Sequence, residues 1–211
     1  MVSEARIVAG EGVTVVIGGG QSNVLADRLE QALDQGACGV LSFGLCGALD
    51  PALRVGDILV ASSDAAWARR LVQAIPGARL AEIAGGDEVV PDAAAKADLR
   101  RRTGAAAVDM ESHIAGRLAR DRNVPFAILR SVSDTADRAL PKAARVGLSA
   151  DGRPDIGAVL GSLIADPRQL PALIRTAREA DGALRALVDA RHLAGPGIGR
   201  LDLGEHLVDV T

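Results

Sequence analysis

Residues 39–57 read GVLSFGLCGALDPALRVGD, and this stretch decides the fold class. Gly39–Phe43 is an apolar run that predicts a buried strand ending in Gly44. After Pro51 the chain leads into another apolar run, Asp57–Ala61, so a second strand follows the loop. Strands that read as continuous apolar runs are typical of a mostly parallel sheet with helices on both faces.

The same alternation of apolar runs and amphipathic segments continues along the chain. Further strands are predicted at Val13–Ile17, Arg79–Ile83, Ala105–Val108 and Pro125–Val132. Helices are predicted at Ser22–Asp34, Asp64–Ile75, Asp92–Arg102, Glu111–Arg120, Ile156–Ile164 and about 170–192. We therefore expect an α/β fold of three α/β/α layers with a mixed, mostly parallel central sheet. Residues 1–211 are expected to form a single domain, with a helical C-terminal extension at 155–211.

Composition excludes several classes of protein. Of the 211 residues, 48% are hydrophobic and 24% charged, as in globular domains. The net charge of −3 lacks the basic balance of nucleic-acid binders, so no nucleic-acid partner is expected. Aromatic residues make up 1%, which disfavours base-stacking platforms. Of the 24 Lys and Arg residues only Lys96 and Lys142 are lysines, a bias more typical of a GC-rich genome than of a phosphate-binding surface.

The cysteines and the N-terminal residues indicate a cytoplasmic protein. Two cysteines, Cys38 and Cys46, suffice for neither a disulfide framework nor a zinc site, so no metal is expected. Met1–Ile7 lacks the apolar core of a signal peptide. No apolar run approaches the roughly 18 residues of a membrane-spanning helix.

Two glycine-rich stretches follow predicted strands. Gly18–Asn23 (GGGQSN) can present backbone N–H groups to an anion, with Gly19 and Gly20 as the candidate phosphate contacts, or it can be a turn without a ligand. It lacks the third glycine of a dinucleotide fingerprint. Gly44–Ala48 (GLCGA) superficially resembles a nucleophile elbow around Cys46, although no helix follows directly. A Cys46-dependent hydrolase and a small residue in a crowded loop both remain open.

Carboxylates follow two further predicted strands. One strand ends in Val108–Ser112 (VDMES), and the next in Ser131–Asp137 (SVSDTAD). Helix caps and turns would account for each acidic residue taken singly. Because ligands of such sheets bind where strands end, we expect the two sets of carboxylates to converge at one mouth.

These four stretches, in this order, resemble the nucleoside phosphorylase and nucleosidase superfamily, whose members break the N-glycosidic bond of purine nucleosides. The resemblance covers about residues 1–165. It is strongest to the hopanoid-associated phosphorylases, which act on adenosylhopane, through Glu4–Ile7 (EARI), Val108–His113 (VDMESH) and the Gly195–Gly204 tail. It also implies that the first strand of the family's sheet is missing, which would leave sheet edges unpaired.

The resemblance implies two catalytic residues. Asp134 is similar to the general acid that protonates adenine N7, with Ser133 orienting it. Glu4 is similar to the base that activates water. Cleavage passes through an oxocarbenium-like transition state, so an acid must serve the leaving group and a nucleophile the sugar.

The resemblance also implies the substrate contacts. Glu111 would accept hydrogen bonds from the ribose hydroxyls, and Met110 would pack on the ribose. Val90 would read the adenine edge through its backbone, with Val89 against the ring. The remaining candidate contacts lie in the second glycine stretch: Gly44, Cys46 and Gly47.

The nucleophile and the 5′ group stay open at this stage. Many phosphorylases of the superfamily have Arg where Ser42 stands and Ser where Leu45 stands, which favours water over phosphate as nucleophile. Phosphate remains an alternative co-substrate, and no cofactor is expected. Adenosylhopane would bring the chain into peripheral contact with the inner membrane face, and a homodimer is expected. The alternatives are a methylthioadenosine/adenosylhomocysteine-type nucleosidase and an inactive truncated homologue. The candidates for an apolar wall beside ribose C5′ are Leu193, Ile198, Leu201, Leu203 and Leu207.

Overall fold

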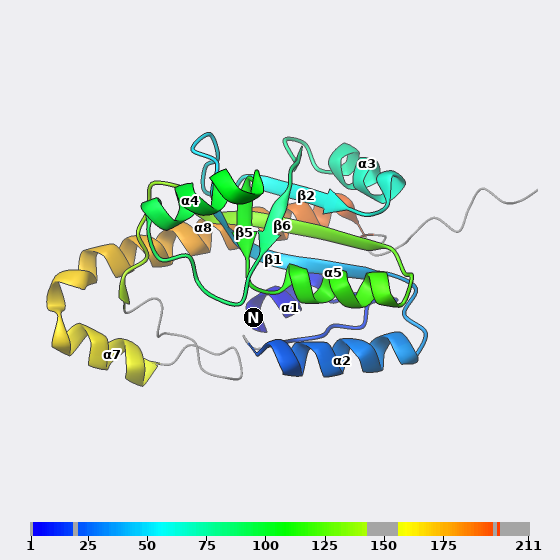
Figure 1. The fold of residues 1–211 in the computed structure, drawn as a ribbon, viewed down its shortest axis with the longest axis horizontal. Coiled ribbons are helices and arrows are strands. Elements are labelled where there is room, and N and C mark those ends of the chain that lie inside the picture. Colours follow the sequence, from blue (N-terminus) through cyan, green and yellow to red (C-terminus); the bar gives the residue numbers. More distant parts are fainter. Residues whose placement is uncertain (1, 19–20, 143–155, 196–197, 199–211) are drawn as a thin grey trace, which may run out of the picture.

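The computed structural model describes residues 2–18, 21–142, 156–195 and 198. Within them, six strands form one mixed sheet in the order β3-β2-β6-β1-β5-β4 (Figure 1). The strands are β1 (Val40–Ala48), β2 (Ile58–Ser62), β3 (Arg79–Leu80), β4 (Ile83–Gly85), β5 (Ala107–Asp109) and β6 (Phe126–Asp134). The helices are α1 (Val2–Val8), α2 (Ser22–Asp34), α3 (Ala65–Ala74), α4 (Ala93–Thr103), α5 (Ser112–Asp121), α7 (Ile156–Ala165), the 3₁₀ turn η1 (Pro167–Gln169) and α8 (Leu170–Ala194).

The centre of the sheet is the parallel pair β1 and β6. β2 runs antiparallel to β6 on one side, and β5 runs antiparallel to β1 on the other. The short outer strands β3 and β4 are each parallel to their neighbours. The predicted α/β class with a mixed, mostly parallel sheet is confirmed.

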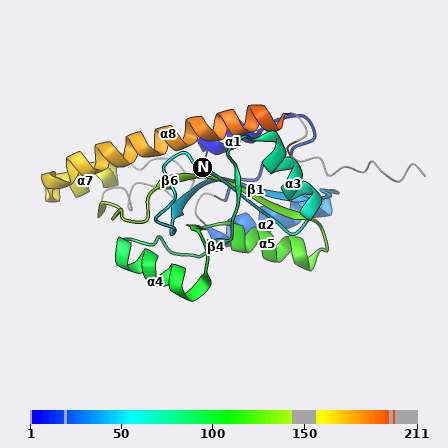
Figure 2. The same cartoon turned by 90° about the horizontal axis from the view of Figure 1, so that it is seen from above.

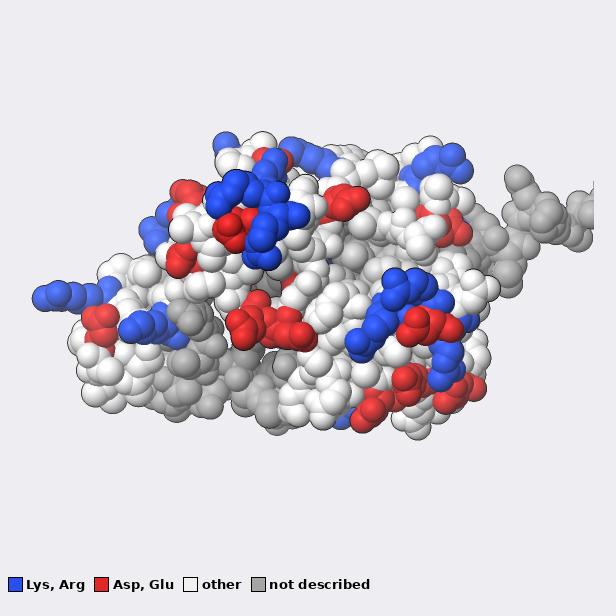
Figure 3. Space-filling view, viewed as in Figure 1, with Lys and Arg blue, Asp and Glu red and all other residues white. Residues whose placement is uncertain are grey.

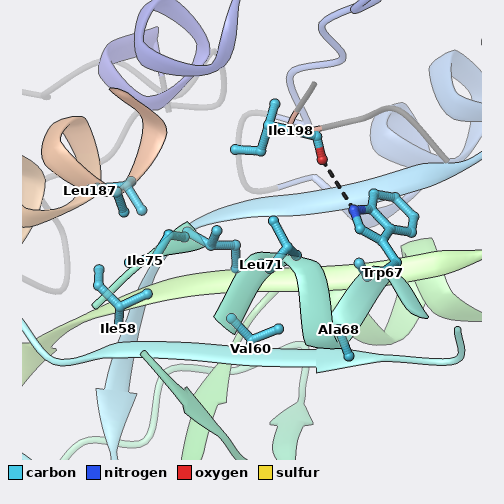
Figure 4. Close-up of a cluster of buried hydrophobic side chains, with 11 residues drawn as sticks. Ile58, Val60, Trp67, Ala68, Leu71, Ile75, Leu187 and Ile198 are labelled. Carbon is cyan, nitrogen blue, oxygen red and sulfur yellow. Dashed lines mark hydrogen bonds between the residues drawn. The ribbon is translucent and has the colours of Figure 1, made fainter. Parts of the chain in front are cut away.

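Helices cover both faces of the sheet. Figure 2 shows α8 and α1 on one side and α2 with α5 on the other. On the first side, Trp67 and Leu71 of α3 and Leu187 of α8 pack on β2 and β6 in one buried cluster (Figure 4). The indole Nε1 of Trp67 donates to the carbonyl of Ile198 at 3.1 Å, which satisfies the polar group of a buried ring.

Local signals explain most helix boundaries. Asp64 caps α3 by accepting from the N–H groups of Ala66 and Trp67. α4 ends at Gly104, whose φ of 73° suits glycine at a helix C-terminus. α2 has the predicted bounds; its N-cap is Gln21, and the Ser22 hydroxyl donates to Asp87.

Three predicted strands differ from the structure. β1 continues through the second glycine stretch to Ala48, because Gly44 and Cys46 keep their register with β6. The segment 79–83 divides into β3 and β4, which lie at opposite edges of the sheet. Val13–Ile17 is not a strand, since a cavity separates it from the edge of β1 and the two make no ladder. Within the described residues, β1 pairs along 40–46 only with β6, and β5 pairs with it at Gly47 and Ala48.

The candidate apolar wall is only partly visible. Leu193 is exposed, whereas Ile198 is buried against the Trp67 cluster and is therefore part of the core. Leu201, Leu203 and Leu207 lie outside the described residues. Among the helices that the structure describes, none combines the length and apolarity needed to cross a membrane.

Candidate active site

Residues 44–47 of β1 are the strand segment around which the predicted carboxylates gather. Gly47 pairs with Asp134 of β6 on one side and with Val108 of β5 on the other. β6 therefore ends, at Asp134, beside residues 44–47. The turn that follows β5 and carries Glu111 begins beside the same residues. The two strand ends therefore flank residues 44–47 from opposite sides, with β6 running parallel to β1 and β5 antiparallel to it.

Asp134 is buried, and two side chains contact its carboxylate. Lys96 Nζ from α4 forms a short ion pair with Oδ2, and Ser133 Oγ lies 2.9 Å from Oδ1. Gly47 faces the same group: a Cβ built there would lie 3.2 Å from Oδ2. The absence of a side chain at Gly47 thus makes room for the Asp134 carboxylate.

A second buried ion pair lies one strand away. Arg130 Nε of β6 donates to Asp109 Oδ2 at 2.8 Å, and its Nη2 donates to Ser42 Oγ at 2.6 Å. Asp109 Oδ1 accepts from the N–H groups of Glu111 and Ser112, which open α5. This pair therefore fixes the turn that carries Glu111.

Glu4 reaches the same segment from α1. Its Oε1 accepts from the backbone N–H of Leu45 at 2.9 Å, and the residue is buried. A Cβ at Gly44 would lie 2.5 Å from both Glu4 Oε1 and Arg130 Nη1. Glu4 and Arg130 hence occupy the space left by the absence of a side chain at Gly44.

Glu4 and Glu111 both line a cavity of about 430 Å³. The cavity runs along the open edge of β1 and is bounded on its far side by residues 12–18, with Leu25 and Leu29 of α2. Glu111 occupies the N-cap position of α5, but its side chain does not cap that helix. The two glutamates are therefore placed at one hollow by α1 and by the β5–α5 turn.

The candidate base contacts Val89 and Val90 lie on the loop after β4. Val89 is 37% exposed, whereas Val90 packs against Leu49 and Val108. Met110, the candidate ribose contact, lies in the turn between β5 and α5 and is 36% exposed. Asp87 of the loop after β4 accepts from Ser22 Oγ at 3.0 Å.

The loop is held by polar contacts to two helices. Besides the Ser22 bond, Asp87 Oδ1 lies 3.2 Å from Nε2 of His113 in α5. The hydrogen bond from Ser22, followed by the one from His113, lowers the pKa of Asp87. The loop with Val89 and Val90 is thus tied to α2 and α5.

Cys46 is unsuited to be a nucleophile. Its thiol lies within β1 and is 3% exposed, packed with Val132 and Leu59. Burial raises the pKa of the Cys46 thiol far above its ordinary value; Arg130 opposes the shift, and Asp109 and Asp134 add to it. The thiol stays neutral, which removes the basis for a Cys46-dependent hydrolase.

We expect the two cysteines to differ sharply toward thiol reagents. Cys38 is exposed and Cys46 buried, so the native protein should react at one thiol and the denatured protein at two. Ellman titration with and without guanidinium measures this difference, and Cys38→Ser should remove the native reaction. Rapid loss of both thiols in the native state, together with activity, would restore the Cys46 hypothesis.

We expect Gly44→Ala to destabilise the fold. The added methyl would meet Glu4 and Arg130 at 2.5 Å, and overpacking of this kind costs about 1–3 kcal/mol. Gly161→Ala in α7 is the matched control, because its Cβ meets no heavy atom within 4 Å. Thermal melting followed by circular dichroism compares the two. Equal melting temperatures would show that residue 44 has space in solution.

Two charged residues of the site were not predicted from the sequence: Lys96 and Arg130. Gly19 and Gly20, the candidate phosphate contacts, lie outside the described residues. Across the part of the chain that the structure describes, no group of three or more His, Cys, Asp or Glu residues could hold a metal ion.

Comparison with known proteins agrees with this arrangement. Residues 61–155 match the phosphorylase superfamily. The matched segment contains β5, β6, Lys96 and Asp134, and it is just under half of the chain. Among curated proteins, none matches the chain.

Solved nucleosidases share the fold. The 5′-methylthioadenosine/S-adenosylhomocysteine nucleosidase of Neisseria meningitidis superposes with a TM-score of 0.59 at 16% identity, over 86% of this chain and 78% of that one. The corresponding Helicobacter pylori enzyme superposes with a TM-score of 0.59 at 18% identity, over 84% of this chain and 75% of that one. A futalosine hydrolase mutant of Helicobacter pylori superposes with a TM-score of 0.51 at 21% identity, over 54% of this chain and 65% of that one. The chain thus spans about two thirds of the last protein and three quarters of the others. At these identities the likeness establishes the fold.

Proposed function

We propose that this chain is a nucleosidase of the phosphorylase superfamily that cleaves the N-glycosidic bond of an adenine nucleoside. One observation carries the proposal: carboxylates from three elements gather around residues 44–47 of β1. Asp134 faces Gly47, whereas Glu4 binds the N–H of Leu45.

Hydrolysis of a glycosidic bond needs an acid for the leaving group and a base that activates the attacking water. We assign Asp134 to the leaving base and Glu4 to the attacking water. Glu111, at the same cavity as Glu4, would hold the ribose hydroxyls, and its charge would favour the developing cation.

Water is the proposed nucleophile rather than phosphate. The Leu45 N–H bonds to Glu4, and the Ser42 hydroxyl accepts from Arg130. Both positions at which phosphorylases of the superfamily bind phosphate are thus engaged by protein groups. Measuring base release with and without phosphate tests this choice, because a phosphorylase would depend on phosphate and form ribose 1-phosphate.

Adenosylhopane is the proposed substrate, which places the chain in peripheral contact with a membrane. Besides the sequence resemblance, large apolar side chains are exposed on the α7–α8 hairpin. Ile164 is 82%, Leu170 47% and Ile174 44% exposed. Burial of apolar surface contributes about 25 cal/mol per Å², which would favour a lipid nucleoside over a small one.

Methylthioadenosine is the second candidate substrate, because solved methylthioadenosine nucleosidases share the fold. The experiment compares kcat/KM for adenosylhopane in detergent micelles with kcat/KM for methylthioadenosine in water. Preference for adenosylhopane supports the lipid substrate. Preference for the small nucleoside would assign the chain to methylthioadenosine cleavage.

A further inference from the structure

Lys96 is buried on a helix that is otherwise basic on its surface. Figure 3 shows Lys and Arg side chains gathered over α4, where Arg101 and Arg102 pair with Asp98. Lys96, by contrast, is the one buried residue of Ala93–Thr103, at 1% exposure. Because an ammonium group is costly to remove from water, its position calls for a partner.

That partner is the proposed general acid. Lys96 Nζ donates to Asp134 Oδ2 in a short ion pair and to the carbonyl of Thr135 at 2.9 Å. Ser133 Oγ lies 2.9 Å from Asp134 Oδ1 and 3.1 Å from the carbonyl of Cys46, and its single proton can serve only one of the two. The group that must give a proton to the leaving base is thus in direct contact with an ammonium group that carries protons.

We propose that Lys96 supplies this proton, so that Lys96 and Asp134 act as one relay; the inference rests on the proposed function. One N–H bond of the ammonium breaks as an O–H bond forms on Asp134. Asp134 passes a proton to N7 of the leaving adenine, and the electron pair of the glycosidic C–N bond goes to the base. Water attacks the ribose and loses its proton to Glu4. Lys96 ends as a neutral amine and Asp134 as a carboxylate.

The relay must be reset after each turnover, when the Lys96 amine takes up a proton and Glu4 releases one. Thr135, whose carbonyl accepts from Lys96, lines a cavity of about 700 Å³ beside α4. Lys96 is thus a positioning residue that acts through Asp134, without contact to the nucleoside.

The test compares two nucleosides in the wild type and in Lys96→Met. The Met side chain has a similar length but no proton to give. With adenosine-type substrates, kcat should fall by about 10²-fold or more. With an N7-methylated nucleoside, whose base leaves without taking up a proton, kcat should change less than about threefold. Equal losses on both substrates would reduce Lys96 to a structural role, and unchanged kcat on both would overturn the relay.

A double variant keeps the test decisive if Lys96→Met folds poorly. Lys96→Met/Asp134→Asn replaces the ion pair by two neutral groups, so no buried charge is left unpaired. If Lys96 acts only through Asp134, the double variant should be no slower than Asp134→Asn. A further loss of 10-fold or more would contradict the relay. Absence of base release by the wild type would overturn the proposed function itself, and the relay with it.

Discussion

Asp134→Asn is expected to lower kcat by about 10²–10⁴-fold on adenine nucleosides, because the amide keeps the shape of the carboxyl but transfers no proton. The residue ends β6 beside Gly47 and is buried. Single-turnover measurement of base release checks the loss directly. Asp98→Asn, on the exposed face of α4, is the control and should retain full activity.

Stability must be measured together with this loss. Asp134→Asn leaves the Lys96 ammonium buried without its carboxylate, which can destabilise the fold by about 3–5 kcal/mol. Its melting temperature should therefore fall, and the assay should be run well below it. A folded Asp134→Asn protein with more than a tenth of the wild-type kcat would contradict the assignment.

Glu111→Gln is expected to lower kcat by about 10- to 100-fold, because hydrogen bonds to a charged group contribute about 1.5–3 kcal/mol. The amide still accepts a hydrogen bond but carries no charge to stabilise the ribosyl cation. The loss should appear in kcat more than in KM. A 2′-deoxynucleoside makes one contact fewer, so the substitution should cost it less than the ribonucleoside.

The comparison of the two sugars isolates the contact. Glu30→Gln on the exposed face of α2 is the control and should leave both substrates unaffected. Equal losses for the ribo and deoxy substrates would place Glu111 away from the 2′-hydroxyl. Glu111 at the 430 Å³ cavity would then have a structural role and no contact with the substrate.

Helices could be predicted from the sequence because their signals are local. Asp64 and Gly104 mark the ends of α3 and α4, and apolar periodicity gave α2 its bounds. The strands depend on their neighbours. β1 continues through Gly44 and Gly47 only because β6 pairs with them, and residues 13–17 remain outside the sheet because nothing in the described chain pairs with them.

The acidic residues of the site could be predicted because they follow apolar strands. The buried cations that pair with these carboxylates could not. Asp134 and Glu111 stand out as polar residues after apolar runs. Lys96 lies in a helix of ordinary composition, and its burial beside Asp134 and Thr135 depends on the tertiary structure. One signal was present: lysine is rare in this arginine-rich chain. Arg130 gave another, as a charge inside the most apolar strand.

The central claim is that this site breaks the N-glycosidic bond of an adenine nucleoside through Asp134. Chromatography of adenine and the ribosyl product, released from adenosylhopane or methylthioadenosine by the purified chain and by Asp134→Asn, tests it most directly. The account predicts equal amounts of the two products from the wild type and at least a 100-fold slower release by the variant. No adenine from either nucleoside, or release at the same rate by both proteins, would contradict it.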